Sequence, residues 1–470
     1  MTEYTLLIDG AAVATTASDP VIDPASGAVF AHAPQAGTAE LERAVAAARA
    51  AFPAWAADEP LRRQVLARAA ERLRERAGPI AQLITREQGR PLAQALGEVQ
   101  YGAAILDSYA AFTVPDEVLA ERPGAAPVQV VRAPLGVVAA ITPWNVPVLL
   151  LLRDIVPALL AGNTVVAKPS EHTPLSSLAL GRALADIFPA GVLNILAGGK
   201  ELGAELTRHP DVAKVTFTGS VRGGKAVAAQ TAGDLKRVSL ELGGNDAAIV
   251  LADAPVEKVA RALFEAAFFN AGQICFAVKR VYAARAVFAP LVAALAALAD
   301  AARPGPGLDP ASTLGPLTTR EQFDRVRALV ADALAHGAVL HQGQAPLPAE
   351  GYFHAPTIVT GIGKGVALVD EEQFGPVLPV IPFDDVEEAI AAANDTPFGL
   401  GGSVWSADVA QAARIVQRLD VGYGWVNQHA RPFPAAPGGG HKWSGIGYRG
   451  GRIGYDEYVA LQVVDAVPLA

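Results

Sequence analysis

The chain of 470 residues contains only one cysteine, Cys275, and one methionine, Met1. A single cysteine cannot form a disulfide within the chain or supply a zinc site built from several thiolates, so neither feature stabilises the fold. The thiol is therefore either a small buried apolar group or a chemical reagent.

Basic charge and long apolar runs are also scarce. Lysine and arginine number 38 against 47 aspartates and glutamates, a formal net charge of −9, which argues against a nucleic-acid partner. Hydrophobic residues make up 51% of the chain, which excludes disorder as its dominant state.

The apolar run 146–152 meets Arg153 and Asp154, and 287–299 contains Pro290, so neither reaches the roughly 18 residues of a membrane helix. The N-terminus carries Glu3 and no basic region before an apolar stretch, so we expect a cytoplasmic protein without a signal peptide and no membrane partner.

Several catalytic and nucleotide-binding signatures are missing. There is no G-x-S-x-G and no H-E-x-x-H, and the 8 histidines are scattered, so we expect no catalytic metal. Segment 219–226 resembles a Walker A loop but has Ala226 where a Mg²⁺-binding hydroxyl belongs. A strand ending at Thr218, then Gly219 and Ser220, then a helix, still predicts backbone N–H groups that can bind a phosphate. A phosphate site without Mg²⁺ suggests a dinucleotide, although no G-x-G-x-x-G occurs.

The order of predicted elements indicates an α/β protein of two or three domains. Short β pieces and turns precede a helical region from Thr38 to about Phe112. Strands and helices then alternate, which favours parallel sheets covered by helices, and a second alternating stretch runs from about 247 to 425. The predicted strands are 128–132, 136–142, 163–168, 192–197, 214–218 and a tail strand at 455–464. The predicted helices are 175–187, 201–207, 256–270, 320–336 and 386–394.

Three residues are candidates for a catalytic role. Cys275 follows a helical stretch at a Gly-Gln junction rather than on an apolar periodic face, which favours the reagent. Glu241 lies in a strand-like apolar run before two glycines; it is either an edge-strand charge or a general base whose pKa is raised by apolar surroundings. Asn145, after the strand 136–142, is either an ordinary turn residue or an amide that stabilises an oxyanion.

Seven ordered motifs resemble the aldehyde dehydrogenase superfamily over essentially the whole chain. They are I-T-P-W-N at 141–145, A-K-P-S-E-x-T-P at 167–174, F-T-G-S at 217–220, L-E-L-G-G-N at 240–245, G-Q-x-C at 272–275, E-E-Q-F-G-P at 371–376 and N-x-x-P-F-G-L at 394–400.

The resemblance implies a catalytic role for each of the three residues. Cys275 would attack the aldehyde carbon, and Asn145 with the Cys275 backbone N–H would form the oxyanion hole. Hydride would pass to the nicotinamide and leave a thioester, which water activated by Glu241 would hydrolyse to the acid. The resemblance therefore implies an NAD-dependent, non-acylating aldehyde dehydrogenase.

The resemblance also implies a set of cofactor contacts. Lys168 and Glu171 correspond to adenosine-ribose contacts, Ser220 to the pyrophosphate contact, and Glu372 with Phe374 to nicotinamide-side contacts. A carboxylate such as Glu171 accepts from ribose hydroxyls but repels a 2′-phosphate, which favours NAD over NADP. The full predicted set is Thr142, Trp144, Lys168, Ser170, Glu171, Gly199, Gly203, Phe217, Gly219, Ser220, Leu242, Glu372 and Phe374.

The implied fold has two Rossmann-like open parallel-sheet domains, one for the cofactor and one for catalysis, plus a small β oligomerisation element. The implied boundaries are 1–119 and 137–243 for the NAD-binding domain, 244–456 for the catalytic domain, and 120–136 with 457–470 for the oligomerisation element. The expected assembly is a homodimer or homotetramer.

The substrate is predicted only by class. Arg153, on the helix after Asn145, would bind a carboxylate of a semialdehyde or contact a polar aromatic aldehyde; a salt bridge to a neighbouring acid is the alternative. Val146, Ile274 and Phe276 would line the substrate site. The segment 434–445 is longer than the family pattern, and Arg449 stands where a glutamate is often found, so substrate assignment stays open.

Two other functions are compatible with the motifs. A CoA-acylating semialdehyde dehydrogenase usually lacks the glutamate base, so Glu241 counts against it. A catalytically silent binding protein on the same fold would not need Cys275, Glu241 and Asn145 together.

Overall fold

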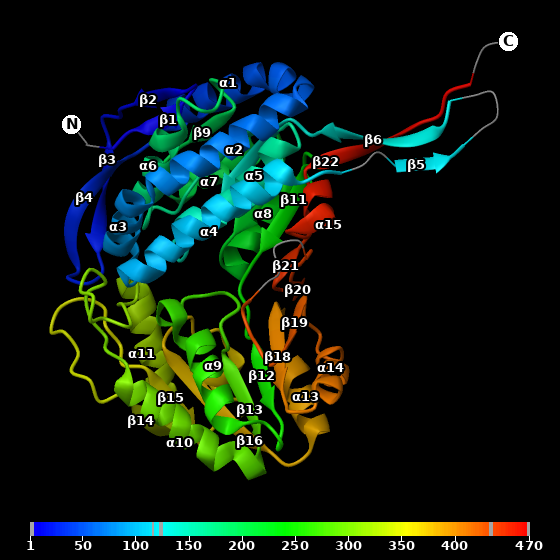
Figure 1. The fold of residues 1–470 in the computed structure, drawn as a ribbon. Coiled ribbons are helices and arrows are strands. Elements are labelled where there is room, and N and C mark those ends of the chain that lie inside the picture. The colour runs from blue at the N-terminus through cyan, green and yellow to red at the C-terminus, as the bar shows by residue number, and fades with distance from the viewer. Residues whose placement is uncertain (1–3, 115–116, 122–125, 432–435, 468–470) are drawn as a thin grey trace.

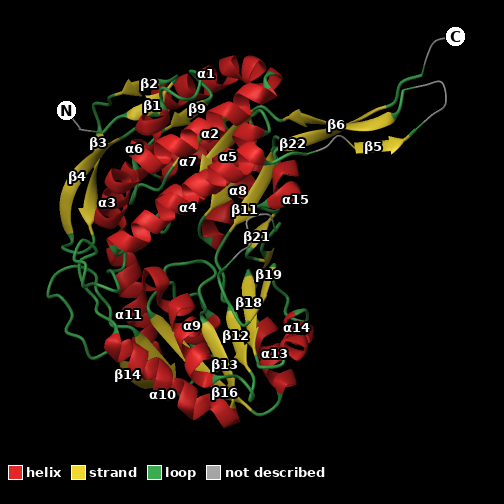
Figure 2. Ribbon diagram, viewed as in Figure 1, coloured by secondary structure: helices red, strands yellow, loops and turns green. Residues whose placement is uncertain are grey.

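The computed structural model describes residues 4–114, 117–121, 126–431 and 436–467, and it forms two α/β units and a projecting β arm. In Figure 1 the upper unit contains the blue N-terminal helices, and the lower unit contains the green-to-orange part of the chain. Figure 2 shows helices and strands interleaved in both units. This architecture confirms the predicted α/β fold with two Rossmann-like sheets.

The upper unit is built on an eight-stranded sheet with a parallel centre. Its order is β2 (Ala11–Val13), β1 (Leu6–Ile8), β9 (Leu193–Ile195), β8 (Thr164–Lys168), β7 (Val137–Ile141), β10 (Val212–Thr218), β11 (Arg237–Glu241) and β21 (Gly445–Ile446). Strands β9 to β11 run parallel, and the edges are antiparallel. Strands β7 and β8 are buried along their whole length, as expected for apolar runs inside a parallel sheet.

Helices cover both faces of this sheet. They are α1 (Thr38–Ala57), α2 (Glu59–Glu75), α3 (Ala77–Gln88), α4 (Leu92–Ala111), α5 (Pro147–Leu160), α6 (Leu175–Leu184), α7 (Lys200–Arg208) and α8 (Val221–Ala232). Helices α1, α7 and α8 pack on one face and α5 and α6 on the other, with α2, α3 and α4 outside α5 and α6. The main apolar core lies between these layers.

The lower unit has a seven-stranded sheet. Its order is β14 (Val339–Gln342), β15 (Thr357–Thr360), β16 (Val377–Phe383), β13 (Arg280–Ala284), β12 (Ala247–Val250), β18 (Gly401–Trp405) and β19 (Tyr423–Val426), parallel except for β14. Its helices are α9 (Val256–Phe268), η1 (Phe269–Gly272), α10 (Arg285–Ala301), α11 (Arg320–Ala335), α12 (Ala367–Asp370), α13 (Val386–Asn394) and α14 (Val409–Val416). A separate core fills this unit.

The arm is a three-stranded antiparallel sheet in the order β22 (Val459–Val464), β6 (Val128–Pro134) and β5 (Glu117–Ala120). It projects from the upper unit in Figure 1. Two further antiparallel pairs are β3 (Ser18–Asp23) with β4 (Ala28–Pro34), and β17 (Phe398–Gly399) with β20 (His441–Lys442).

The element predictions are confirmed except at the tail. The five predicted strands between 128 and 218 correspond to β6 to β10, and the predicted helices to α6, α7, α9, α11 and α13. The tail strand was predicted to begin at Tyr455, but this residue belongs to helix α15 (Gly451–Asp456), and β22 begins at Val459. The valines and leucine of β22 produced the strand pattern, while Gly454 and Tyr455 pack back on Arg449 and Phe112 as part of a short helix.

The predicted domain boundaries stay a prediction. Strand β21 joins the first sheet, although its residues fall inside the range predicted for the catalytic domain. Among the described residues, no helix combines the length and apolarity that crossing a membrane requires.

Candidate active site

The candidate site lies at the carboxyl ends of the first sheet, against the loop that precedes β13. From β7 the chain continues to β8 on one side, whereas β10 lies on the other side of β7, so the strand order reverses between β7 and β10. Open α/β sheets bind ligands in the crevice at such a reversal. Thr142, Lys168 and Gly219 stand at the ends of these three strands.

Cys275 is placed by a tight turn after α9. Asn270, Ala271 and Gly272 have φ angles of 54°, 53° and 74°, which ends the helix in left-handed backbone. A Cβ on Gly272 would lie 2.4 Å from the Gly375 carbonyl oxygen, so a larger residue does not fit. The turn brings the Cys275 thiol to Glu241 at the end of β11, with 3.9 Å from Sγ to Oε1.

The Cys275 thiol is held in its protonated form. Burial, together with the negative charge of Glu241, raises the pKa of the thiol well above its usual range, and the cations Lys279 and Arg153 only partly offset this. Thiolate chemistry therefore requires a base close to the sulfur. Glu241 is the carboxylate in contact with it.

Asn145 lies beside the cysteine loop and is fixed on both sides. Its side-chain Nδ2 donates to the Gln273 carbonyl at 2.8 Å, and its own carbonyl accepts from Arg90 Nη2 and Asn270 Nδ2. An amide NH₂ has two hydrogens, so one remains for another acceptor. The structure thus brings Asn145, Glu241 and Cys275 together, as the motifs predicted.

The electrostatic prediction for Glu241 is wrong in sign. Burial alone would raise the pKa of this carboxyl, but the charges of Arg449 and Arg153 outweigh it and hold the pKa below its usual range. Arg449 Nη1 donates to Glu241 Oε2 at 2.6 Å, and Arg153 Nη1 lies 3.9 Å from Oε1. Glu241 is therefore an ionised carboxylate with one oxygen bound and the other turned toward the thiol.

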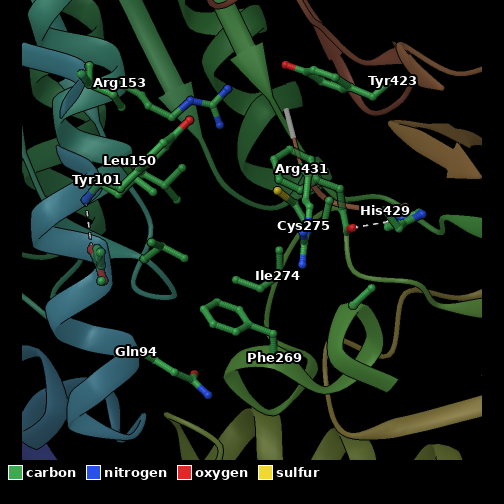
Figure 3. A pocket seen from close by; sticks show the side chains of 18 of the residues that line it. Gln94, Tyr101, Leu150, Arg153, Phe269, Ile274, Cys275, Tyr423, His429 and Arg431 are labelled. Carbon is green, nitrogen blue, oxygen red and sulfur yellow. Dashed lines mark hydrogen bonds between the residues drawn. The ribbon is translucent and has the colours of Figure 1, made fainter. Parts of the chain in front are cut away.

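A cavity of about 1060 Å³ opens in front of Cys275. Its walls come from helices α4, α5 and α9 and from segments 423–431 and 449–450, and they are mostly apolar. Figure 3 shows the Arg153 guanidinium at one end near Tyr423, with Phe269 and Gln94 toward the other. The predicted substrate residues all line this cavity: Val146, Arg153, Ile274 and Phe276.

The adenosine side of the predicted cofactor site is assembled around Lys168. Its Nζ donates to the carbonyls of Pro169 and Gly198 and lies 3.7 Å from Glu171 Oε2. The Lys168 ammonium, acting against the effect of burial, holds the pKa of Glu171 below its usual range. Ser170 accepts from the His172 backbone N–H, Gly199 caps α7, and Gly203 packs against the Lys168 chain.

The phosphate side is a tight turn between β10 and α8. Ser220 caps α8 by accepting from the Gly223 N–H at 3.2 Å. A Cβ on Gly219 would lie 2.7 Å from the Phe217 ring, so glycine keeps the backbone open there. The side chain of Leu242 lies against Gly224 of the same helix. This turn is the predicted anion site.

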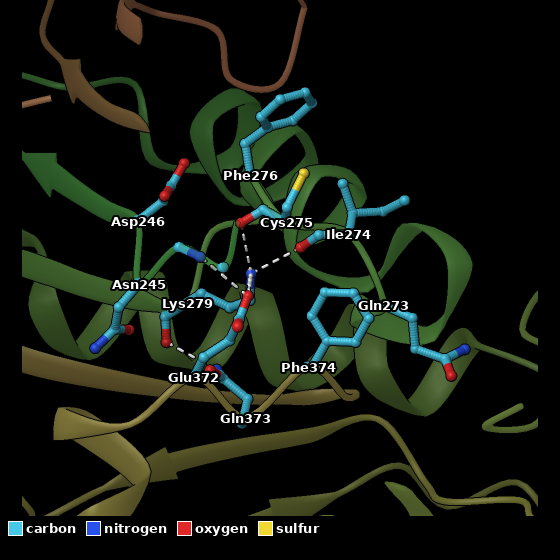
Figure 4. Close-up of polar contacts among 12 residues, drawn as sticks. Asn245, Asp246, Gln273, Ile274, Cys275, Phe276, Lys279, Glu372, Gln373 and Phe374 are labelled. Carbon is cyan, nitrogen blue, oxygen red and sulfur yellow. Dashed lines mark hydrogen bonds and ion pairs between the residues drawn. The ribbon is translucent and has the colours of Figure 1, made fainter. Parts of the chain in front are cut away.

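The nicotinamide side is shown in Figure 4. Lys279 Nζ donates to the carbonyls of Ile274 and Cys275 at 2.7 and 3.0 Å and lies 3.6 Å from Glu372. Glu372 also accepts from the Gly244 N–H, yet burial raises its pKa. Phe374 packs edge-on against Trp144, with ring centroids 5.5 Å apart. Thr142 is nearby in sequence, and its hydroxyl is buried without a partner among the described groups.

The sequence analysis assigned no functional role to three residues of the site: Arg449, Lys279 and Tyr423. Arg449 was visible only as a departure from the family pattern, and its partner Glu241 lies 208 positions away. Lys279 directly precedes β13, and Tyr423 belongs to β19. The residue type alone does not show whether such a side chain points toward the site. Within the described part of the chain, no cluster of side chains suited to a metal ion occurs.

Comparison with known proteins identifies the class. A model of the aldehyde dehydrogenase family matches residues 13–464. A probable succinate-semialdehyde dehydrogenase (NADP+) of Sinorhizobium fredii is 36% identical over 449 residues, covering 94% of this chain and 91% of the relative. A glutarate-semialdehyde dehydrogenase of Pseudomonas putida is 38% identical over 452 residues, covering 94% and 93%.

A solved structure agrees with these relatives. The NAD+ complex of an aldehyde dehydrogenase from Bacillus cereus superposes with a TM-score of 0.95 at 32% identity, covering 98% of this chain and 96% of that one. The chain therefore belongs to the aldehyde dehydrogenase family and is an enzyme that oxidises aldehydes.

Proposed function

We propose that this enzyme oxidises an aldehyde to its carboxylic acid with NAD+, through a thiohemiacetal and a thioester on Cys275. The observation that carries the proposal is the meeting of three groups in front of one cavity: the Cys275 thiol, the ionised Glu241 carboxylate 3.9 Å away, and the fixed Asn145 amide.

The chemistry begins at the thiol. As Sγ adds to the aldehyde carbon, Glu241 Oε1 is the acceptor in reach of the thiol proton, and the aldehyde oxygen becomes an oxyanion. The free N–H of Asn145 and the Cys275 backbone N–H stabilise that oxyanion. A bound nicotinamide ring would supply the hydride acceptor that converts the thiohemiacetal to a thioester.

Hydrolysis completes the cycle. After the first proton has left to water in the cavity, Glu241 takes a proton from the water molecule that attacks the thioester carbonyl. The carbon–sulfur bond breaks, and the acid and the thiol are regenerated. Because Oε2 is bound to Arg449, Oε1 is the oxygen that does this work.

Replacing Asn145 by alanine tests the oxyanion hole. One such donor lowers the barrier by about 2.7–4 kcal/mol, so we expect kcat to fall by roughly 10²–10³-fold with little change in the KM for NAD. Steady-state kinetics of the unaltered enzyme and of Asn145→Ala measure this. Near-normal turnover of Asn145→Ala would contradict the assigned role.

The residues of the predicted cofactor site fit NAD. The open β10–α8 turn suits a pyrophosphate, and Lys168 with Glu171 suits the ribose hydroxyls. The buried Thr142 hydroxyl has no hydrogen-bond partner among the described residues, so a polar group of a bound cofactor could satisfy it. Glu372 and Phe374 would face the nicotinamide side.

Glu171 predicts the cofactor preference. Its ionised carboxylate accepts from ribose hydroxyls and repels a 2′-phosphate, so kcat/KM with NAD should exceed that with NADP. In Glu171→Gln the repulsion disappears, and the ratio of the two values should move toward NADP. A higher kcat/KM with NADP in the unaltered enzyme would refute the preference.

The cavity supports a substrate with an apolar body and a polar or anionic group near its aldehyde. The Arg153 guanidinium is a cation of the cavity wall close to Tyr423 in Figure 3, and its Nη1 lies 3.9 Å from Glu241 Oε1. A carboxylated semialdehyde or a polar aromatic aldehyde fits this description. The names of the two relatives above are consistent with the first class.

A panel of aldehydes tests the proposed function and the substrate class together. NADH formation is measured with short aliphatic, aromatic and carboxylated aldehydes, in the native enzyme and in Arg153→Met. We expect the variant to lose kcat/KM selectively for substrates that carry an anionic or hydroxyl group. If no aldehyde in the panel gave NADH, the proposed function would be refuted.

We further propose that the arm mediates a homodimer or homotetramer. Leu461 and Val463 of β22 and Leu119 of β5 are more than half exposed, which is unusual for apolar strand residues in a monomer. Light scattering of the native chain and of Leu461→Glu would reveal whether the arm holds copies together.

A further inference from the structure

Arg449 binds two buried carboxylates at once. Its Nε donates to Asp154 Oδ1 at 2.7 Å and its Nη1 to Glu241 Oε2 at 2.6 Å. Its Nη2 donates to the hydroxyls of Thr218 and Thr216 at 2.8 and 3.3 Å. The guanidinium is therefore held on three sides.

The charges in this cluster are almost fully removed from solvent. Asp154, Glu241 and Arg449 are 0%, 3% and 7% exposed, so each carboxylate depends on the guanidinium for compensation. An arginine does not lose its proton in a protein, so Arg449 cannot serve as a proton acceptor. It acts as a permanent positive charge beside Glu241.

Separate parts of the fold determine the position of Arg449. Thr216 and Thr218 lie on one face of β10, and Thr218 is in register with Glu241 on β11. Asp154 comes from α5. The backbone N–H and carbonyl of Arg449 both bond to Gly438, at 2.7 and 2.8 Å. Neither end of the side chain is free to move.

From this arrangement we infer that Arg449, anchored by Asp154, is the positioning residue that keeps Glu241 ionised with Oε1 turned toward the thiol, and that it sets the lower pH limit of thioester hydrolysis. The inference rests on the proposed role of Glu241 as the base that activates water.

Among the charged and titratable groups around Glu241, Arg449 makes the shortest contact with its carboxylate and therefore contributes most to keeping it ionised. Arg153 on α5 also lowers the pKa of Glu241, but its Nη1 lies 3.9 Å from Oε1, whereas Arg449 Nη1 lies 2.6 Å from Oε2. The Cys275 thiol is neutral, and Tyr423 on β19 is a phenol whose pKa is raised by burial. Without Arg449, only the more distant Arg153 would oppose the effect of burial, so the pKa of the Glu241 carboxyl would rise.

The experiment uses the only thiol of the chain as a reporter. p-Nitrophenyl acetate acetylates the sulfur and releases p-nitrophenolate, so the acyl-enzyme forms without aldehyde or cofactor. Excess ester is removed, and intact mass follows the loss of the acetyl group that hydroxylamine can release. This decay is measured across the pH range in the unaltered protein and in four variants.

The double variant Asp154→Asn with Arg449→Met is the central test because it removes one charge of each sign. We expect its decay at about pH 6 to be roughly 10- to 100-fold slower than at about pH 8.5, since a desolvated carboxyl gains a proton in that range. The unaltered protein should show no such fall. Arg449→Lys should restore much of the decay at low pH. Asp154→Asn alone weakens the anchor but leaves Arg449 bonded to Glu241, so its fall in decay at low pH should be smaller than that of the double variant.

The acetylation and decay measurements distinguish a failure of the inference from a failure of the proposed role of Glu241. Stoichiometric acetylation of the double variant shows that the site has folded. A decay that slows equally at all pH values, or that keeps the unaltered pH profile, would overturn the inference. Glu241→Gln is the reference: if its acetyl group decays as fast as in the unaltered protein, the proposed role of Glu241 fails instead.

Discussion

Replacing Cys275 by alanine should abolish NADH formation from every aldehyde that the enzyme accepts. In the proposed mechanism the sulfur is the atom on which the thiohemiacetal and thioester form, and no second cysteine occurs in the chain. Loss of a nucleophile from a site that acts as a unit costs at least about 10⁴-fold in kcat. Alanine leaves the site open and removes only the thiol.

Alkylation gives a second measurement of the same prediction. Iodoacetamide should label one site per chain and abolish activity in parallel, whereas Cys275→Ala should take up no label. Because burial and Glu241 raise the pKa of the thiol, the thiolate fraction is small at neutral pH, and labelling should accelerate as the pH rises. A fully alkylated enzyme that still oxidises aldehydes would refute the central role of the sulfur.

The fold was predictable because local patterns and tertiary structure agree in its centre. The apolar runs of β7 and β8 are long enough for strands and too short for helices, and they became the buried middle of a parallel sheet. The tail shows the limit of such patterns. Tyr455 belongs to a short helix that begins where Gly450 and Gly451 adopt positive φ, a backbone conformation that strand propensity does not register.

The membership of the site was also predictable, whereas its electrostatics were not. Motifs identified Asn145, Glu241 and Cys275 as candidates; in the structure Cys275 contacts Glu241, and Asn145 is bonded to Gln273 in the cysteine loop. An apolar strand sequence around Glu241 predicts a raised pKa, but the sign depends on Arg449 and Arg153, which arrive from a distant loop and from α5. The pKa of a group depends on its neighbours in space, and for Glu241 these neighbours are distant in the sequence.

The same ionised Glu241 leads to the second large prediction. In Glu241→Gln the thiol loses its nearest proton acceptor, but it also loses the negative charge that raises its pKa, so addition to the aldehyde can proceed through the thiolate. The first turnover should therefore release up to one NADH per chain in a burst that accelerates as the pH rises. Hydrolysis of the thioester then lacks its general base, and the steady-state rate should fall by about 10²–10⁴-fold. Glutamine has nearly the same shape and still presents an oxygen to Arg449, so the change removes the charge and basicity of the carboxylate without altering its volume.

Stopped-flow measurement of NADH separates the burst from the steady state. The matched control is Glu372→Gln, another buried carboxyl replaced by its amide, which lies on the predicted nicotinamide side. That variant should raise the KM for NAD without accumulating thioester. A Glu241→Gln enzyme with a steady-state rate within about tenfold of the native one would show that another group activates the water, because a general base contributes more than that.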